Sequence, residues 1–291
     1  MSAAKRVITH IVEKIAAEEL GAYGVHVLVG DDEAEHRWRS DDRENLYSVS
    51  KGVSVLAAGI AVGEGLIALD THVVDALPNM QLGKGVESVT LRHLLTMTSG
   101  IDFEWFGDQI VPWGDLAQEM LRRETRGPGG CFQYSDASTY VAMRMLGARV
   151  GDVRDWLIPR LFEPLDIHNP QWHRCPLGWI VGGSGLELRT HELARIGRLL
   201  RDRGDWNGKG IVASEWIDSM HEDWFLTGGP ALWGSYGMGV WKGPGNGWRL
   251  DGAYGQYVYV SEAHDAVVTI TAHEESHDHR LVEIAAEALF S

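Results

Sequence analysis

Residues 48–63 read SVSKGVSVLAAGIAVG, and this stretch constrains the arrangement of everything else in the chain. Lys51 is its only charged residue, and every other position is small or apolar. A helix that is apolar on all sides is buried inside a large domain. The sequence therefore predicts a central helix over residues 50–63, with the remaining elements packed around it.

Two side chains at the start of this stretch are candidates for chemistry. Ser48 and Lys51 stand three residues apart, so on a helix they lie on one face. A buried lysine is unfavourable unless it has a partner or a function. Because desolvation lowers the pKa of a lysine, Lys51 is expected to take the proton of the Ser48 hydroxyl, and the helix N-terminus favours negative charge on that oxygen. The alternative is a capping serine followed by a lysine that reaches solvent.

Composition narrows the class of protein. The chain has 291 residues, of which 44% are hydrophobic and 23% charged, as in a globular protein with a sizeable core. Its 26 Lys and Arg residues against 41 Asp and Glu residues give a net charge of −15, which argues against nucleic acid and anionic membranes as partners. Cys131 and Cys175 are too few for a disulfide framework or a cysteine-rich zinc site, and free thiols are expected, with a single disulfide as the alternative. No targeting segment or membrane span is visible, and we expect a cytoplasmic protein.

Periodicity predicts the α+β class. Strands are expected near both ends of the chain and helices between them, which favours an antiparallel sheet built from both termini, flanked by helices, with an inserted, mostly helical region. We treat residues 1–291 as a single domain, with its α/β part over about 1–65 and 180–291 and its helical part over about 66–179. Strands are predicted at 23–29, 35–39, 254–260 and 266–272, and helices at 8–20, 50–63, 90–97, 114–125, 136–150, 189–204 and 279–290.

Two further segments carry candidate chemistry. The residues YSD at 134–136 follow a turn rich in glycine and proline and begin a helix. A tyrosine beside the serine–lysine pair would relay a proton to the leaving group, although by itself the segment also fits a core tyrosine with a capping residue after it. The residues GAYGQ at 252–256 would let a strand backbone approach a substrate and offer an N–H to an oxyanion, although a β-bulge fits equally well.

Together and in this order, the three segments resemble the motifs of the serine hydrolase family that includes class C β-lactamases, D-alanyl-D-alanine carboxypeptidases, type VIII esterases and 6-aminohexanoate-dimer hydrolases. VTLRHLLTMTSG at 89–100 is similar to the family stretch ITLRHLLTHTSG, and GSGLELRTHEL at 183–193 and YGMG at 236–239 also resemble family segments. The resemblance covers about residues 20–275. It implies a β-lactamase/transpeptidase-like fold, with the active site in the cleft between the sheet and the helical region.

The resemblance implies a role for each matched residue. Ser48 attacks a carbonyl and becomes acylated, and Lys51 takes its proton. Tyr134 assists proton transfer to and from the leaving group. The backbone N–H groups of Ser48 and Ala253 form the oxyanion hole.

The chain departs from the β-lactamase pattern at two places. Asp136 stands where β-lactamases usually carry asparagine, and it either pairs with Lys51 and keeps it charged or points away as a helix cap. Leu250 stands where they carry lysine or histidine, and Arg249 or Lys242 is the candidate substitute for that cation. Both departures disfavour β-lactam turnover and favour the esterase and amidase branch.

We therefore expect a serine hydrolase that cleaves a small ester or amide through an acyl-enzyme on Ser48, with no metal or cofactor. The alternatives are a β-lactamase or D-alanyl-D-alanine carboxypeptidase, and a penicillin-binding-type sensor with little turnover. The natural substrate and the oligomeric state stay open. Aromatic side chains in several loops suit an apolar group on the substrate, namely Trp105, Phe106, Trp113, Trp233, Trp241 and Trp248. The expected substrate-binding residues are Asp136, Gly252, Tyr254, Trp105 and Trp233.

Overall fold

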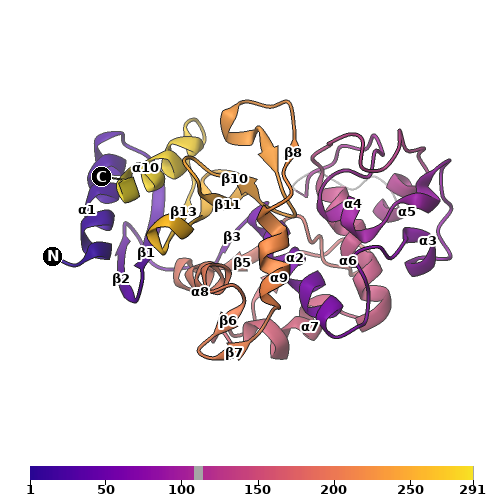
Figure 1. The fold of residues 1–291 in the computed structure, drawn as a ribbon, viewed down its shortest axis with the longest axis horizontal. Coiled ribbons are helices and arrows are strands. Elements are labelled where there is room, and N and C mark those ends of the chain that lie inside the picture. Colours follow the sequence, from indigo (N-terminus) through magenta and orange to yellow (C-terminus); the bar gives the residue numbers. More distant parts are fainter. Residues whose placement is uncertain (108–113, 291) are drawn as a thin grey trace.

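An eight-stranded sheet, with strand order β2-β1-β13-β12-β11-β10-β9-β8, forms the centre of one half of the molecule (Figure 1). The structure is a computed structural model that describes residues 1–107 and 114–290. The N-terminal hairpin of β1 (Ala22–Val29) and β2 (Asp32–Arg37) pairs through β1 with β13 (Ala266–Ala272), so both ends of the chain build the sheet, as predicted. The other strands are β12 (Gln256–Ser261), β11 (Trp248–Gly252), β10 (Trp241–Lys242), β9 (Ser235–Tyr236) and β8 (Phe225–Leu226).

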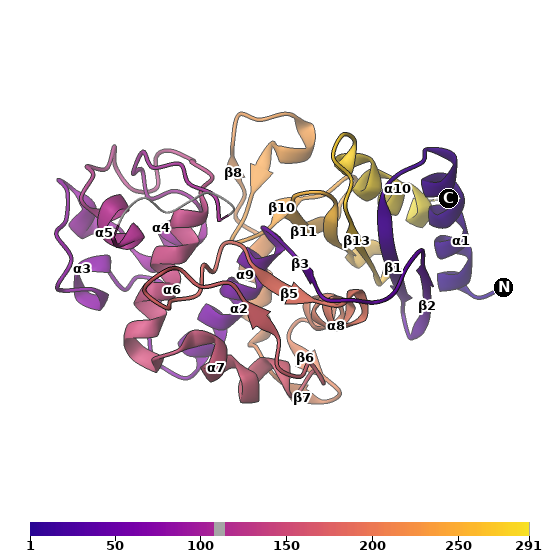
Figure 2. The ribbon, with the colours of Figure 1, turned by 180° about the vertical axis from the view of Figure 1, so that it is seen from behind.

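Helices cover both faces of this sheet. α1 (Ala3–Ala17) and α10 (Asp278–Phe290) lie side by side on one face, and α8 (Thr190–Arg201) packs on the other (Figures 1 and 2). Side chains along β12 point alternately to the two faces of the sheet. Tyr257 and Tyr259 pack in the cluster under α1 and α10, whereas Val258 and Val260 pack in the main core.

The predicted central helix is α2 (Val49–Gly63), which begins one residue earlier than expected. All of its residues from Val49 to Ala61 are buried. It contacts β11 and β12 on one side and α6 (Asp136–Val150) on the other, so it joins the sheet to the helical region (Figure 2). Gly59 lets it pack closely, because a Cβ there would lie 2.7 Å from Trp216 Cε2 of α9 (Ser214–His221).

The helical region surrounds α6, which is buried from Asp136 to Gly147. α4 (Leu91–Leu95) and α5 (Leu116–Leu121) contact α6 directly, as does α3 (Val73–Ala76). α7 (Val153–Leu157) and the turns η1 (Val86–Ser88) and η2 (Ile158–Phe162) complete this part of the chain. The treatment of the whole chain as one domain stays a prediction.

Several short elements were not expected from the sequence. Two-residue and three-residue strands are too short to show an alternating pattern. One group is β3 (Glu44–Asn45), β5 (Leu186–Leu188) and β4 (Gln171–Trp172), which form a small sheet beside α2. The others are the pair β6 (Asp205–Trp206) and β7 (Lys209–Gly210), the edge strands β8 to β10, and the turns η3 (Ala231–Trp233) and η4 (Glu262–His264).

The predicted strand 254–260 begins only at Gln256. Tyr254 and Gly255 have φ values of 63° and 90°, so residues 253–255 form the turn between β11 and β12. The third motif is therefore a hairpin turn.

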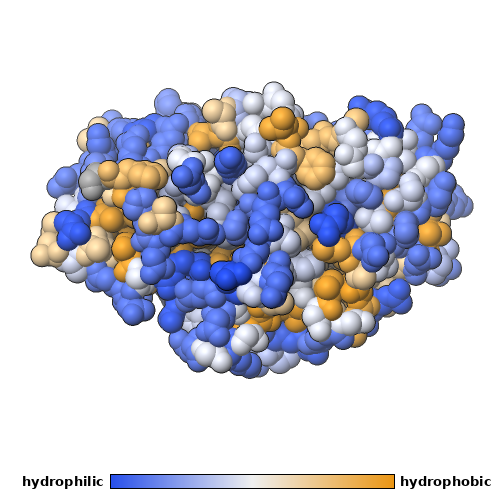
Figure 3. Space-filling view, viewed as in Figure 1, coloured by the Kyte–Doolittle hydropathy of each residue, from blue (hydrophilic) through white to orange (hydrophobic). Residues whose placement is uncertain are grey.

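The face of the molecule seen in Figure 3 is mostly hydrophilic, with scattered apolar patches. Within residues 1–107 and 114–290, no helix has both the length and the apolar character needed to cross a bilayer.

Candidate active site

Ser48 lies at the N-terminus of α2, where it is the N-cap residue and is half-buried. The backbone before it is constrained, because Tyr47 has a φ of 46°, in the left-handed region that side chains rarely adopt. Its ring lies edge-on to Tyr254, with centroids 5.0 Å apart, and Tyr254 also has a positive φ. Two unusual backbone positions thus meet beside the candidate nucleophile, as is common at functional sites.

Lys51 lies one helical turn further along α2 and is 1% exposed. Its Nζ donates to Ser48 Oγ at 2.7 Å and to the carbonyl oxygen of Gly183 at 3.0 Å. It also donates to Asp136 Oδ1, with which it forms a buried ion pair. The structure thus brings Ser48, Lys51 and Asp136 together.

Asp136 is the first residue of α6 and is 2% exposed. Its second oxygen, Oδ2, accepts from the backbone N–H of Gly107 at 2.7 Å. Its own N–H donates to the carbonyl oxygen of Trp105 at 2.8 Å. Gly183 allows the close approach on the other side, because a Cβ there would lie 2.8 Å from the Cα of Asp136. Each carboxylate oxygen of Asp136 therefore has its own hydrogen-bond donor, Lys51 Nζ for Oδ1 and the Gly107 N–H for Oδ2.

The electrostatics of Lys51 differ from the expectation. Burial by itself disfavours the ammonium and lowers the pKa, but the carboxylate of Asp136 and the hydroxyl of Tyr134 outweigh it, and the pKa of Lys51 is raised. The expectation that desolvation leaves Lys51 neutral is wrong. The alternative in which Asp136 pairs with Lys51 is the one the structure contains.

Tyr134 stands beside this group and is half-buried. Lys51 Nζ lies 4.5 Å from the centre of its ring. On its other side the ring packs against Tyr236 and Trp241, at centroid distances of 5.6 and 5.3 Å, and against Phe132 at 6.5 Å. Tyr134 thus joins the polar group to an aromatic cluster. Met97, which stands where the family stretch carries histidine, is 1% exposed in the same cluster.

The third motif lies against the N-terminus of α2. A Cβ on Gly252 would overlap the carbonyl oxygen of Leu46 and lie 3.2 Å from the backbone N of Val49, so only glycine fits there. Ala253, the next residue, is exposed. The backbone of the hairpin turn therefore comes close to the first turn of α2, where helical N–H groups have no intrahelical acceptor.

Arg249 is not available to bind a substrate. It is completely buried, its guanidinium pairs with Asp251, and it donates to the carbonyl oxygens of Lys242 and Leu232. The suggestion that Arg249 replaces the missing cation is therefore wrong. Lys242, the other candidate, is exposed on β10.

The two tryptophans expected at the substrate take different positions. Trp105 is 2% exposed and belongs to the main hydrophobic core, where its backbone bonds to Ser135 and Asp136. Trp233, in η3, is half-buried against the aromatic cluster beside Tyr134. Trp113 lies outside the described residues.

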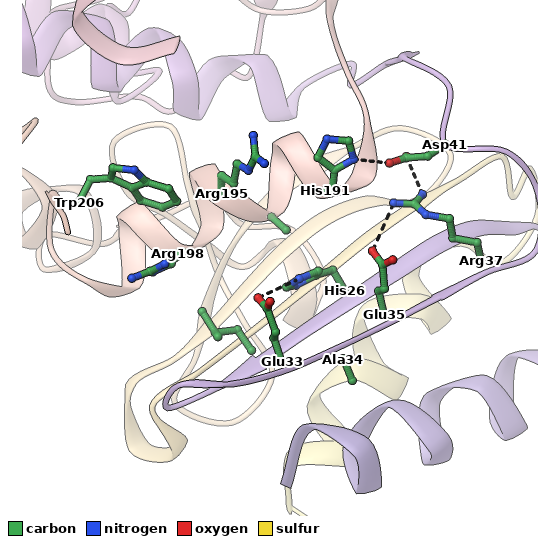
Figure 4. Close-up of a pocket in the computed structure, with 12 residues that line it drawn as sticks. His26, Glu33, Ala34, Glu35, Arg37, Asp41, His191, Arg195, Arg198 and Trp206 are labelled. Atoms are coloured by element: carbon green, nitrogen blue, oxygen red, sulfur yellow. Dashed lines mark hydrogen bonds and ion pairs between the residues drawn. The ribbon is translucent and has the colours of Figure 1, made fainter. Parts of the chain in front are cut away.

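A cavity of about 640 Å³ lies elsewhere, between the β1–β2 hairpin and α8 (Figure 4). None of the predicted site residues lines it. Most of its charged side chains already pair with each other or with neighbours, as Figure 4 shows for Asp41 between Arg37 and His191. This cavity is separate from the Ser48 group.

Sequence reasoning missed several contributors to the site, among them Gly107, whose backbone N–H donates to Asp136. Gly183 was quoted only as part of a matching segment, yet its carbonyl oxygen binds Lys51. Tyr47 gave no signal, because a positive φ at a tyrosine cannot be read from sequence. In the described ranges, His, Cys, Asp and Glu side chains form no group of three or more that is placed to hold a metal ion.

A sequence profile of the Beta-lactamase family matches residues 6–289. The chain belongs to the Beta-lactamase family. A 6-aminohexanoate-dimer hydrolase of Paenarthrobacter ureafaciens is 27% identical over 203 residues. That match spans 62% of this chain and about half, 51%, of the relative.

Solved structures show the same fold. A family VIII carboxylesterase superposes with a TM-score of 0.76 at 15% identity, covering 99% of this chain and 98% of that one. A penicillin-binding protein homologue from Caulobacter crescentus superposes with a TM-score of 0.76 at 16% identity, with coverage of 99% and 98%. The β-lactamase/transpeptidase-like fold is thus confirmed, and family membership makes the chain a relative of hydrolases such as the 6-aminohexanoate-dimer hydrolase.

Proposed function

We propose that the protein is a serine hydrolase that cleaves a small ester or amide through a covalent acyl-enzyme on Ser48. One observation carries the proposal. The half-buried Ser48 hydroxyl lies at the N-terminus of a buried helix, 2.7 Å from a lysine ammonium that is itself hidden from solvent. A cation and a helix N-terminus aimed at one hydroxyl oxygen stabilise the negative charge that this oxygen gains when it loses its proton.

The residues suggest how the reaction runs. Ser48 Oγ attacks the carbonyl carbon and forms the new C–O bond. Its proton passes by way of the Tyr134 hydroxyl to the leaving oxygen or nitrogen as that bond breaks. The N–H groups of Ser48 and Ala253 are the proposed donors to the oxyanion, because Gly252 brings the hairpin turn against the first turn of α2. Water then releases the acid from Ser48.

Two features favour a neutral ester or amide over a β-lactam. Leu250, which stands in place of the cation, is apolar and packs into the core at 1% exposure. The guanidinium of Arg249 is bound to Asp251 and to two carbonyl oxygens, so it cannot bind a substrate carboxylate. The aromatic cluster beside Tyr134 suits an apolar group on the substrate. The names of the 27% identical relative, a 6-aminohexanoate-dimer hydrolase, and of the carboxylesterase with the same fold agree with cleavage of an ester or amide. A cytoplasmic location belongs to the same proposal, because Cys131 and Cys175 are both free thiols, which suits a reducing compartment.

Hydrolysis of p-nitrophenyl acetate and butyrate by the wild type and by Ser48→Ala tests the proposal. Ser276→Ala, in an exposed loop, is the matched control. We expect the wild type and the control to be equally active and Ser48→Ala to be inactive. Equal activity in all three, or none in the wild type, would refute the assignment.

A chromogenic cephalosporin measured beside the esters separates the alternatives. Faster turnover of the cephalosporin would favour a β-lactamase. A stable penicillin adduct on Ser48, seen by mass spectrometry without turnover of any substrate, would favour a sensor.

A further inference from the structure

We infer that Asp136 is a positioning residue that keeps Lys51 as a fixed cation, so that Lys51 stabilises charge on Ser48 Oγ and does not accept its proton. The inference rests on the proposed serine hydrolase function. It gives Asp136 a role in the reaction itself, in place of the substrate contact expected from the sequence.

The hydrogen bonds around Asp136 define its charge state. Oδ1 accepts from Lys51 Nζ, and Oδ2 accepts from the N–H of Gly107 at 2.7 Å. Since Oδ2 already faces a backbone N–H, a proton on Asp136 could lie only on Oδ1, where it would point at Lys51 Nζ, and an amine is a far stronger base than a carboxylate. Asp136 is therefore an ionised carboxylate, and at 2% exposure it needs a positive partner to remain so.

Lys51 is that partner. An ammonium has three N–H groups and no acceptor, and Nζ has three oxygens around it, on Ser48, Asp136 and Gly183. For Lys51 to take the Ser48 proton it must first lose one of its own, which would leave the carboxylate of Asp136 buried without a counter-charge. Such a state is strongly disfavoured.

The other ionisable groups facing this pair do not supply a second cation. Tyr134 lies over Nζ, and Tyr236 packs on Tyr134 from β9. Both are phenols, and burial raises the pKa of Tyr236 well above its ordinary value, so it stays neutral in the pH range of assays. Removing the charge of Asp136 therefore takes away the main interaction that opposes the effect of burial on Lys51, and the pKa of Lys51 should fall.

The test measures the rate at which a fluorophosphonate probe labels Ser48 in the wild type and in Asp136→Asn, between pH 6 and pH 9. If the ammonium form of Lys51 is required, Asp136→Asn should slow relative to the wild type as the pH rises, because Lys51 loses its proton only in the variant. The labelling rate of Asp136→Asn divided by that of the wild type should then fall by at least about tenfold from pH 6 to pH 9. Asp152→Asn is the matched control. Asp152 pairs with Arg174 and caps α7 away from Ser48, and asparagine caps a helix equally well, so its ratio to the wild type should not change with pH.

A ratio that is constant with pH would overturn the inference, and so would one that rises with pH, since a rise means that a neutral Lys51 works as the base. Failure of the wild type to be labelled on Ser48 would instead count against the proposed function.

A second measurement needs no variant. The chain has six lysines, so the Nζ signal of Lys51 can be followed by NMR in protein with ¹⁵N-labelled lysine. It should remain an ammonium signal through pH 9, and a signal that titrates below pH 9 would overturn the inference even if Asp136→Asn does not fold.

Discussion

Gly52→Ala provides a quantitative test of how α2 packs on β11. A Cβ at this position would overlap Leu250 Cδ2 and lie 3.0 Å from Cδ1 and 3.1 Å from Cγ. Leu250 is 1% exposed, so it has little room to move. Replacing a helical glycine by alanine gains at most about 1 kcal/mol from helix propensity, and Gly52 is the fourth residue of α2. Overpacking a core costs about 1–3 kcal/mol, so we expect a net loss of about 1 kcal/mol.

The same helix supplies the control. A Cβ on Gly63 has no neighbour within 4 Å, so Gly63→Ala should be neutral or stabilising by up to about 1 kcal/mol. Urea unfolding monitored by tryptophan fluorescence measures both variants, and Gly52→Ala should also melt about 2–4 °C below the wild type.

A double-mutant cycle then isolates the contact. Leu250→Ala alone should cost about 2–5 kcal/mol, because it leaves a cavity. Adding Gly52→Ala to it should cost nothing further, since the new methyl group enters that cavity. The reasoning fails if Gly52→Ala stabilises the protein as much as Gly63→Ala does, or if the effects of Gly52→Ala and Leu250→Ala add.

Three further predictions follow from the site. Tyr134→Phe keeps the ring in the aromatic cluster but removes the hydroxyl, so kcat should fall by about 10²–10⁴-fold with an unchanged melting temperature. In the folded chain, the pKa of Lys51 is raised because its counter-charge outweighs the effect of burial, and the pKa of Tyr236 is raised by burial. The folded state therefore holds these two protons more tightly than the unfolded state does. The stability they contribute is complete below about pH 10 and is lost as the pH rises further, so the free energy of unfolding in urea should drop above pH 10 and not between pH 7 and 9. Arg249→Met leaves Asp251, whose side chain is only 12% exposed, without its cation and should destabilise the protein by about 3 kcal/mol in the same assay, whereas a loss below about 1 kcal/mol would mean that the pair is solvated.

The central helix could be predicted because the signal is local. The run from Val49 to Gly63 has one charge and no polar face, and no other position in a fold of this size suits such a helix. The hairpin at the N-terminus and the pairing of both ends of the chain could be predicted for a similar reason, since long alternating strands show their pattern in sequence.

The charge of Lys51 could not be predicted, because it depends on a residue 85 positions away. The burial of Lys51 could be predicted from the sequence, but burial alone predicts a lowered pKa, whereas the pKa of Lys51 is raised. Only the placement of Asp136 at the start of α6, beside Gly183, decides between a neutral amine and an ammonium.

The direction of side chains on β11 was also hidden. Arg249 and Asp251 share one face of the strand and pair there, while Leu250 points to the opposite face against α2. Sequence shows that neighbours alternate, but it does not show which face meets a helix. For the same reason Trp105 looked like a wall of the substrate site, although it packs in the core.

The pairing of β1 with β13 has a consequence for biosynthesis. Val27 lies opposite Val268, so these partners are 268 − 27 = 241 positions apart in the chain. While the polypeptide leaves the ribosome, β1 stays unpaired on its inner edge until residues 266–272 of β13 have emerged. Contacts of such long range slow folding and leave strand edges open to other chains. The hairpin turn that completes the Ser48 group lies in the same late segment, at residues 253–255. A nascent chain should therefore depend on chaperones until late in synthesis, and it should acquire a reactive serine only at the last stage of folding.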